Sequence, residues 1–322
     1  MEDSMRRWTY RLALLAIALI FVAGCDNGKA GNNDAARTEG KVNVVTTFYP
    51  LYYLAAAIGG EDANVTNLIP AGVEPHDWTP KSRDLQTASR AQLFVYNGAG
   101  LEGWVDDFLH GTGSGGSLRT VEASQGIELI RGNPEEAETH EDHGHEGDLD
   151  VDPHTWVSPK SMLKMASNIL EAYVAADPAH KDAYESRYNE LKSKLEELDG
   201  KMTEGLANVS KRDIVVSHQA FGYLCRDYGL KQVAIMGLSP DAEPRARDLL
   251  DIAKFVKENG VKTIFFEELV SDQLAKTLAA EANVGTDVLN PLEGLTAEQE
   301  KSGDDYVSIM ERNLQNLRKA LQ

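Results

Sequence analysis

Short β-branched and aromatic runs alternate with helical patterns in the first third of the chain. Strands are predicted at 42–47, 65–69 and 93–97. Helices are predicted from Tyr49 onward and at 85–90 and 103–109. This alternation is typical of a parallel α/β sheet, in which helices connect strands that run in the same direction.

The same pattern returns after residue 210. Strands are predicted at 214–217, 233–236, 263–267 and 287–289. Helices are predicted between them, at 220–228, 245–259 and 272–282. The chain is therefore expected to be an α/β protein with two (β/α) lobes, each built on a parallel sheet.

A long amphipathic helix is predicted between the two lobes. It starts after Asp177 and Pro178, and its apolar residues recur at steps of three and four: Tyr184, Tyr188, Leu191, Leu195, Leu198, Met202 and Leu206. About thirty residues at 1.5 Å per residue give a helix of about 45 Å. The stripe fits either a coiled-coil dimerisation segment or a strut packed along both lobes, and we expect the strut.

The N-terminus has the pattern of an export signal. Arg6, Arg7 and Arg11 precede an apolar run at 12–23, which is too short to span a bilayer as a mature helix. The small residues before Cys25 resemble the lipobox of bacterial lipoproteins, which implies a lipid on Cys25 after cleavage; the alternative is an ordinary signal peptide with a chance cysteine. Residues 25–40 are polar and small, as expected of a flexible tether.

Charge and cysteine content exclude several classes of protein. The 322 residues include 32 Lys and Arg against 51 Asp and Glu, a net charge of −19, which argues against nucleic-acid binding. Two cysteines exclude a disulfide-dense scaffold and an all-cysteine zinc site. With Cys25 lipidated, Cys225 has no partner and is expected to be a buried, small apolar residue.

Three histidines occupy predicted loops at the ends of elements. His76 and His154 each follow a proline and lie near an aromatic residue, and His218 ends the predicted strand before Gln219. Loops at the carboxyl ends of parallel strands converge, and imidazole is a good ligand for Zn²⁺. A tetrahedral zinc site needs a fourth ligand. Glu293 follows one predicted strand, Glu267 and Glu268 lie at the end of another, and the residues alone do not rank them.

The segment 133–152 is the most biased in the chain. It carries nine carboxylates, no Lys or Arg, and the histidines His140, His143 and His145. Such a composition predicts a solvated loop. We expect it to collect zinc at low affinity near the buried site; the alternative is an insertion that binds metal only incidentally.

Five motifs in order resemble the metal-binding lipoproteins of ABC transporters, the cluster A-I solute-binding proteins, and within them the zinc branch. They are the lipobox, the Pro75-His76 loop, and the segments 152–156, 217–223 and 290–294. The resemblance covers residues 41–322 and implies two lobes joined by one long helix, with the metal in the cleft between them. It also implies that His76, His154, His218 and Glu293 are the ligands. His218 favours zinc, because the manganese branch usually has a glutamate there.

The resemblance implies a division of the chain into a signal peptide (1–24), a tether (25–40), an N-terminal lobe (41–178), a linking helix (179–209) and a C-terminal lobe (210–322). The expected function is capture of Zn²⁺ on the extracytoplasmic face of the bacterial membrane and delivery to an ABC permease. We expect a lipid-anchored monomer. Four protein ligands close the zinc shell, so an enzyme is disfavoured. The alternatives are a manganese or mixed-metal receptor of the same family and a surface adhesin.

Overall fold

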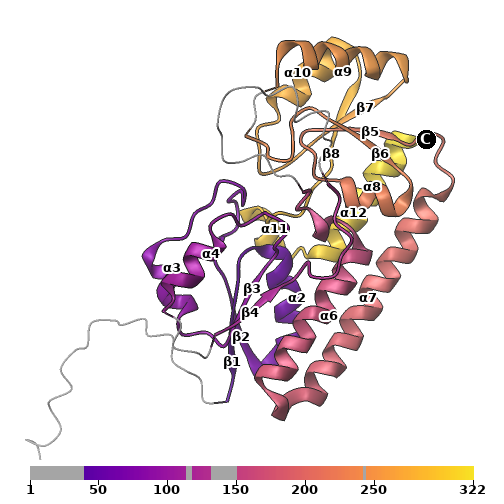
Figure 1. The fold of residues 1–322 in the computed structure, drawn as a ribbon. Helices are drawn as coiled ribbons and strands as arrows, with labels where there is room; N and C mark the ends of the chain where they lie inside the picture. Colours follow the sequence, from indigo (N-terminus) through magenta and orange to yellow (C-terminus); the bar gives the residue numbers. More distant parts are fainter. Residues whose placement is uncertain (1–39, 114–117, 132–150, 242–243) are drawn as a thin grey trace, which may run out of the picture. The chain divides into compact units, whose positions relative to one another are not determined.

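The computed structural model describes residues 40–113, 118–131, 151–241 and 244–322, which belong to one compact unit, Glu39–Gln322. In these residues the strands form two parallel sheets of four strands each, with helices on their faces (Figure 1). The predicted α/β fold with two parallel sheets and one long helix is confirmed. The predicted boundaries of tether, lobes and linking helix stay predictions.

The first sheet has the order β2-β1-β3-β4. Its strands are β1 (Val42–Thr46), β2 (Ala63–Asn67), β3 (Leu93–Tyr96) and β4 (Arg119–Glu122). Side chains alternate between its faces: Val44 and Val95 pack toward α2 (Tyr49–Gly59) and α6 (Pro159–Ala176), whereas Val45 and Phe94 pack toward α3 (Ser82–Ala88) and α4 (Val105–Gly111). Helices on both faces bury the central strands β1 and β3 of this sheet, as is typical of parallel sheets.

The second sheet repeats this topology with the order β6-β5-β7-β8. Its strands are β5 (Asp213–Val216), β6 (Lys231–Ala234), β7 (Thr263–Phe266) and β8 (Gly285–Val288). One face packs against α9 (Ala246–Glu258) and α10 (Gln273–Ala282), and the other faces α8 (Gly222–Tyr228) and α12 (Tyr306–Leu321). The short α11 (Ala297–Ser302) precedes α12. In both sheets the strand order reverses beside the first strand, which creates a switch point at the carboxyl edge.

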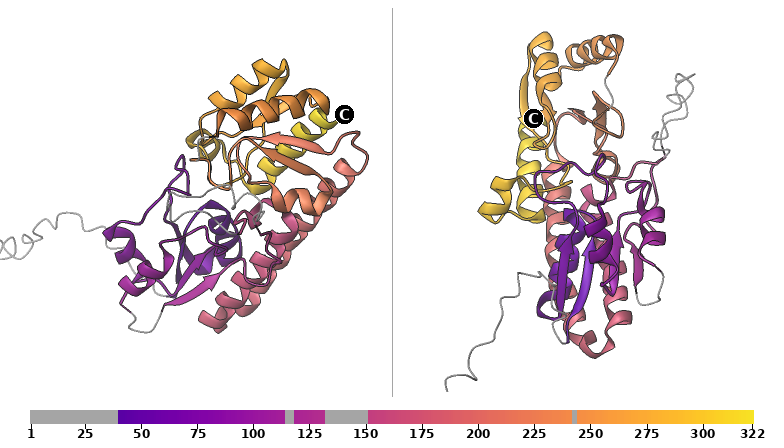
Figure 2. Two further views of the ribbon diagram at one scale, coloured as in Figure 1. Left: turned by 45° about the horizontal axis from the view of Figure 1, so that its top comes forward. Right: turned by 90° about the vertical axis from the view of Figure 1, so that its left-hand side faces the viewer.

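The long helix α7 (Lys181–Ala207) connects the two halves and has 27 residues. A single 3₁₀ turn, Pro178–His180, precedes it and closes a helical hairpin with α6. Its predicted stripe is buried except for the half-buried Tyr188, and it packs within the chain against α2, α6, α8 and α12 (Figures 1 and 2). The stripe is therefore used inside the molecule, as a strut requires, and not as a dimerisation seam.

Several predicted boundaries differ from the structure by a few residues. β2 begins at Ala63 and not at Val65, and β6 and β8 begin two residues before the predicted starts. The predicted β8 was centred on the apolar residues Val288 and Leu289. In the structure Leu289 follows the strand, so the predicted strand lies too close to the C-terminus. β4 was not predicted because Val121 is its one buried residue.

Two further findings concern the predicted export features. None of the helices in the described ranges is long and apolar enough to cross a membrane. Cys225 is a buried free cysteine, and burial raises the pKa of its thiol. The predicted lipidation site Cys25 and the predicted metal-collecting residues His140, His143 and His145 lie outside the described residues.

Candidate metal centre

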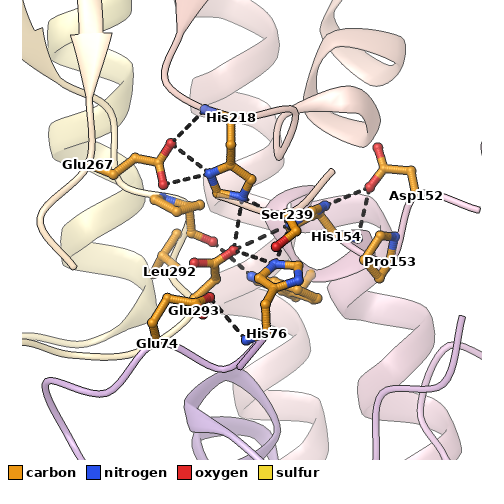
Figure 3. Close-up of polar contacts among 12 residues, drawn as sticks. Glu74, His76, Asp152, Pro153, His154, His218, Ser239, Glu267, Leu292 and Glu293 are labelled. Atoms are coloured by element: carbon orange, nitrogen blue, oxygen red, sulfur yellow. Dashed lines mark hydrogen bonds and ion pairs between the residues drawn. The ribbon is translucent and has the colours of Figure 1, made fainter. Parts of the chain in front are cut away.

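The structure brings together four residues that lie far apart in the sequence. His76 lies in the loop after β2, and His154 lies immediately before the 3₁₀ turn Thr155–Val157 that leads into α6. His218 follows β5, and Glu293 lies in the loop after β8. Their donor atoms form one group (Figure 3). Both halves of the chain therefore contribute to the same site.

Five of the six distances between the four donor atoms are nearly equal, and all four atoms lie within 4.8 Å of one another. His154 Nε2 lies 3.2 Å from both His76 Nε2 and His218 Nε2. Glu293 Oε1 lies 3.3 Å from His76 Nε2, 3.3 Å from His154 Nε2 and 3.2 Å from His218 Nε2. The vertices of a regular tetrahedron with such edges lie about 2.0 Å from its centre, which is the bond length of zinc to imidazole nitrogen and carboxylate oxygen. The side chains are thus spaced as ligands of a single small cation.

The site is almost closed to solvent. His154 and His218 are 0% exposed and Glu293 is 2% exposed. The His76 side chain keeps 5% of its surface exposed, the largest share among the four. Of the four side chains, that of His76 is therefore the most accessible to solvent.

Three of the loops share one local design, in which an acidic or amide residue precedes a proline. Glu74 Oε1 accepts a hydrogen bond from the His76 amide at 3.1 Å, and Asp152 Oδ1 accepts one from the His154 amide at 2.9 Å. In the third loop, Asn290 Oδ1 accepts a hydrogen bond from the Leu292 amide at 2.7 Å. Side chains that bind a backbone amide two residues on form tight turns, and the proline between restricts φ.

Leu292 adds backbone strain to the third loop. Its φ is 59°, in the left-handed region that a leucine rarely adopts, and its side chain is 0% exposed. Packing and the Asn290 turn hold this conformation, which directs the next residue, Glu293, toward the histidines.

Two carboxylates orient two of the histidines. His154 Nδ1 lies 2.8 Å from Asp152 Oδ1. His218 Nδ1 lies 2.8 Å and 2.7 Å from the two oxygens of Glu267, and the His218 amide also donates to Glu267 Oε1 at 3.1 Å (Figure 3). A carboxylate at Nδ1 places the proton there and leaves the Nε2 lone pair free to bind a cation.

The three carboxylates that the sequence offered as a fourth ligand have different roles in the structure. Glu293 belongs to the group of four donors, whereas Glu267 binds the far nitrogen of His218. Glu268 Oε2 accepts hydrogen bonds from Asn290 Nδ2 at 2.5 Å and Gln299 Nε2 at 2.7 Å, so it supports the loop that carries Glu293.

The switch point of each sheet lies at the site. In the second sheet, His218 follows β5 and Glu267 follows β7, so their hydrogen bond crosses the point where the strand order reverses. In the first sheet, Thr47 and Asn97 follow β1 and β3, and buried Glu102 accepts from the Thr47 hydroxyl at 2.7 Å and the Asn97 amide at 2.8 Å. Asn97 Nδ2 then donates to Pro153 O at 2.9 Å, which fixes the residue before His154.

The four groups shift the pKa values of one another because they lie close together and are buried. Burial disfavours charge on His218, yet Glu267 and Glu293 outweigh it and hold its pKa well above 6.5. Burial likewise opposes charge on His154, and hydrogen bonds to Asp152 and Glu293 raise its pKa. Burial lowers the pKa of His76, while the histidines hold the pKa of Glu293 well below 4.5 in spite of burial. A divalent cation would replace protons on the raised histidines.

Sequence reasoning named the four grouped residues and missed the role of Asp152. The signal was available, because Asp152, Pro153 and His154 repeat the order of Glu74, Pro75 and His76. What the sequence could not show is which ring nitrogen each carboxylate serves.

Fold and site together define a two-lobed binding protein whose halves supply nitrogen and oxygen donors to one cation. The family model described as "Zinc-uptake complex component A periplasmic" (ZnuA) matches residues 44–320. The chain belongs to this family, whose members are solute-binding proteins and not enzymes.

Relatives with established names agree with this assignment. The chain is 41% identical over 316 residues to the "High-affinity zinc uptake system protein ZnuA" of Bacillus subtilis, covering 98% of each protein. It is 42% identical over 308 residues to the "Zinc-binding lipoprotein AdcA" of Streptococcus pneumoniae, covering 95% of this chain and 60% of AdcA. The chain thus spans less than two thirds of AdcA.

Solved structures share the fold. The crystal structure of the Zn(II)-bound ZnuA-like domain of Streptococcus pneumoniae AdcA superposes with a TM-score of 0.75 and 40% identity, covering 88% of this chain and 99% of that domain. The laminin-binding protein Lmb of Streptococcus agalactiae, described as a bifunctional protein with adhesin and metal transporting activity, gives a TM-score of 0.76 at 32% identity, covering 87% of this chain and all of Lmb.

Proposed function

We propose that this protein is a zinc-binding receptor of an ABC transporter. It captures Zn²⁺ outside the cytoplasm at His76, His154, His218 and Glu293 and delivers the ion to a membrane permease. The observation that carries the proposal is the buried group of three imidazole nitrogens, each within 3.3 Å of one carboxylate oxygen, Glu293 Oε1.

The donor set favours zinc over manganese. Zn²⁺ accepts four ligands of mixed nitrogen and oxygen type, whereas Mn²⁺ favours oxygen-rich sites of higher coordination number. With Glu267 at Nδ1 of His218, one carboxylate remains in the group of donors. The names of AdcA and ZnuA support the same metal. A manganese or mixed-metal receptor is the alternative, and competition of the two ions for the purified protein distinguishes them.

We further propose that the mature protein is a monomer held by a lipid on Cys25 at the extracytoplasmic face of the bacterial membrane. The lipobox-like sequence before Cys25 and the lipoprotein relative AdcA support this anchor. The permease is inferred from the family. A Cys25→Ser variant is expected to appear in the soluble fraction while it still binds zinc.

The central test removes single ligands. His154→Ala and His218→Ala each delete one of four donors and leave a buried carboxylate partner without its histidine. Each is expected to weaken zinc binding by more than the 10- to 100-fold that is typical of changing only an outer hydrogen-bond partner. Competition against a chelator of known affinity measures this on the purified chain.

A matched control is His180→Ala. His180 ends the 3₁₀ turn that precedes the long helix, its side chain is 40% exposed, and it does not belong to the group of four donors. Zinc affinity of this variant is expected to equal that of the wild type. The site assignment is wrong if His154→Ala or His218→Ala also binds zinc as tightly as the wild type.

Adhesion is a second candidate function, favoured by the similarity to Lmb. Growth separates the two functions. A strain without the gene is expected to grow poorly when zinc is scarce if the protein is a transport receptor, and to grow normally if it serves adhesion alone.

A further inference from the structure

Gly222, the first residue of α8, lies against the carboxylate that orients His154. A methyl group built on Gly222 would overlap Asp152 Oδ2 and would lie 3.3 Å from Ile130 Cδ1. The backbone of Gly222 is not in the left-handed region, so the conformation itself would accept alanine. The constraint at this position is the space that Asp152 occupies.

Asp152 cannot give way without disturbing the metal centre. Its side chain is buried, and Oδ1 accepts both the His154 amide at 2.9 Å and, from the ring, Nδ1 at 2.8 Å. Rotation of the carboxylate to relieve an overlap at Oδ2 would move Oδ1 away from both donors. A side chain at position 222 would therefore act on His154 through Asp152.

Tyr223, the next residue, fixes the backbone of the same segment. Its hydroxyl donates to Asp152 O at 2.7 Å and accepts from the Ile130 amide at 3.2 Å. Asp152 and Ile130 are themselves paired, because the Asp152 amide donates to Ile130 O at 2.8 Å. One hydroxyl thus ties together the two backbone segments that meet at Asp152.

We propose that Gly222 and Tyr223 are positioning residues for zinc binding that act through Asp152 on His154. The inference rests on the proposed function, since it concerns affinity at the same site. The segment 217–223 then has two tasks: it carries His218 from the second sheet, and it sets the partner of His154 from the first half of the chain. Two of the four donors are held in register by one short segment.

The test compares single and double variants of the purified full-length chain by zinc competition with a chelator. Gly222→Ala and Asp152→Ala are each expected to weaken zinc binding by about 10- to 100-fold. In the double variant the methyl group meets no carboxylate, so its affinity is expected to equal that of Asp152→Ala alone. Losses that multiply in the double variant would show a separate, structural effect of Gly222 and would overturn the proposal.

Gly200→Ala is the matched control. Gly200 lies within α7, where a methyl group would meet no atom within 4 Å apart from its chain neighbours and the adjacent backbone of the helix, and its substitution is expected to leave the zinc affinity unchanged. Circular dichroism of the metal-free variants checks that each one folds.

A second variant keeps the proposal falsifiable if Gly222→Ala does not fold, and a second measurement tests Gly222→Ala if it does fold. Tyr223→Phe removes only the hydroxyl and is expected to lower zinc affinity in the wild type but not in Asp152→Ala. The visible spectrum of bound Co²⁺, which reports ligand geometry, is expected to change in Gly222→Ala and not in Gly200→Ala. Wild-type affinity in both Gly222→Ala and Tyr223→Phe overturns this inference alone, whereas a wild-type chain without tight zinc binding overturns the proposed function.

Discussion

At the scale of single residues, the metal centre depends on which nitrogen of each histidine carries a proton. Asp152 and Glu267 hold protons on the Nδ1 atoms of His154 and His218, so both Nε2 atoms face the centre. His76 has its amide held by Glu74 and is the most exposed of the three rings. Two of the proposed ligands are therefore oriented by carboxylates, and the third is the one that is most exposed.

The pKa shifts predict how zinc binding depends on pH. The raised pKa values of His154 and His218 stabilise the metal-free protein fully below the ordinary histidine value of about 6.5, and this stabilisation is lost as pH rises through the raised values. The lowered pKa of His76 acts in the opposite direction, but the pKa values of the other two histidines are raised, and these two set the expected sign. Zinc needs neutral imidazoles, so the increase in Tm caused by zinc is expected to grow with pH above about 6.5.

Thermal unfolding with and without zinc, from acidic to mildly alkaline pH, measures this increase. The pKa of His180 is raised by Asp177, and its titration affects the Tm with zinc and the Tm without zinc equally. Its contribution therefore cancels in the difference between the two Tm values. Glu293 loses its stabilising charge only as pH falls through its lowered pKa, outside this interval. A zinc-induced shift that stays constant across the histidine range would contradict the expectation.

The sequence was sufficient for residues whose chemistry is evident from their type and neighbours. His76 and His154 follow prolines and His218 ends a strand, so all three could be selected as ligands. The partners of these histidines could not be selected from the sequence, because nothing in it distinguishes Asp152 and Glu267 from the many other acidic residues. The fold places each of them 2.8 Å from a ring nitrogen. The positive φ of Leu292 likewise could not be predicted, because leucine rarely adopts this conformation.

At the scale of elements, prediction succeeded where burial decides the pattern. β1 and β3 are central strands covered on both faces, and their apolar runs were located within one residue. The edge strand β4 was missed, because one buried valine gives no periodic signal. The long helix α7 was predicted from a stripe that repeats over its whole length, and six of its seven members are buried.

The apolar stripe of α7 predicts which leucine-to-alanine substitutions lower the free energy of unfolding most. Leu195 is 0% exposed, so Leu195→Ala is expected to lower the free energy of unfolding by about 2–5 kcal/mol through lost contacts and a cavity. Leu250 on α9 is 66% exposed, and Leu250→Ala is expected to change the free energy of unfolding by no more than about 0.5 kcal/mol. Chemical denaturation of the metal-free proteins measures both, and equal losses would contradict the packing of α7 within the chain.

At the scale of the whole molecule, the site exists only because two sheets of the same topology bring their carboxyl edges to one place. His218 and Glu267 lie at the switch point of the second sheet, and the Glu102 network lies at that of the first. No local pattern in the sequence shows that Gly222 of one half lies against Asp152 of the other. The prediction of the site between the lobes therefore depended on family resemblance and not on periodicity.

The net charge of −19 is a property of the whole molecule, and the segment 133–152 contributes much of it. This segment holds nine carboxylates and three histidines. We propose that this segment collects zinc at low affinity and raises its concentration near the buried site. Deletion of residues 135–148 removes seven of those carboxylates together with His140, His143 and His145. The variant is expected to bind fewer zinc ions and to load more slowly, while the tight site keeps its affinity because its four donors remain.

Replacing only the three histidines of the segment by alanine is the matched control, since it keeps every carboxylate. If imidazoles bind the collected ions, this variant loses the extra zinc as the deletion does; if charge alone attracts them, it keeps fast loading at low ionic strength and loses it as salt screens the carboxylates. Equilibrium dialysis gives the number of ions, and stopped-flow mixing gives the loading rate. The proposal is wrong if the deletion leaves zinc stoichiometry, loading rate and growth on scarce zinc all unchanged.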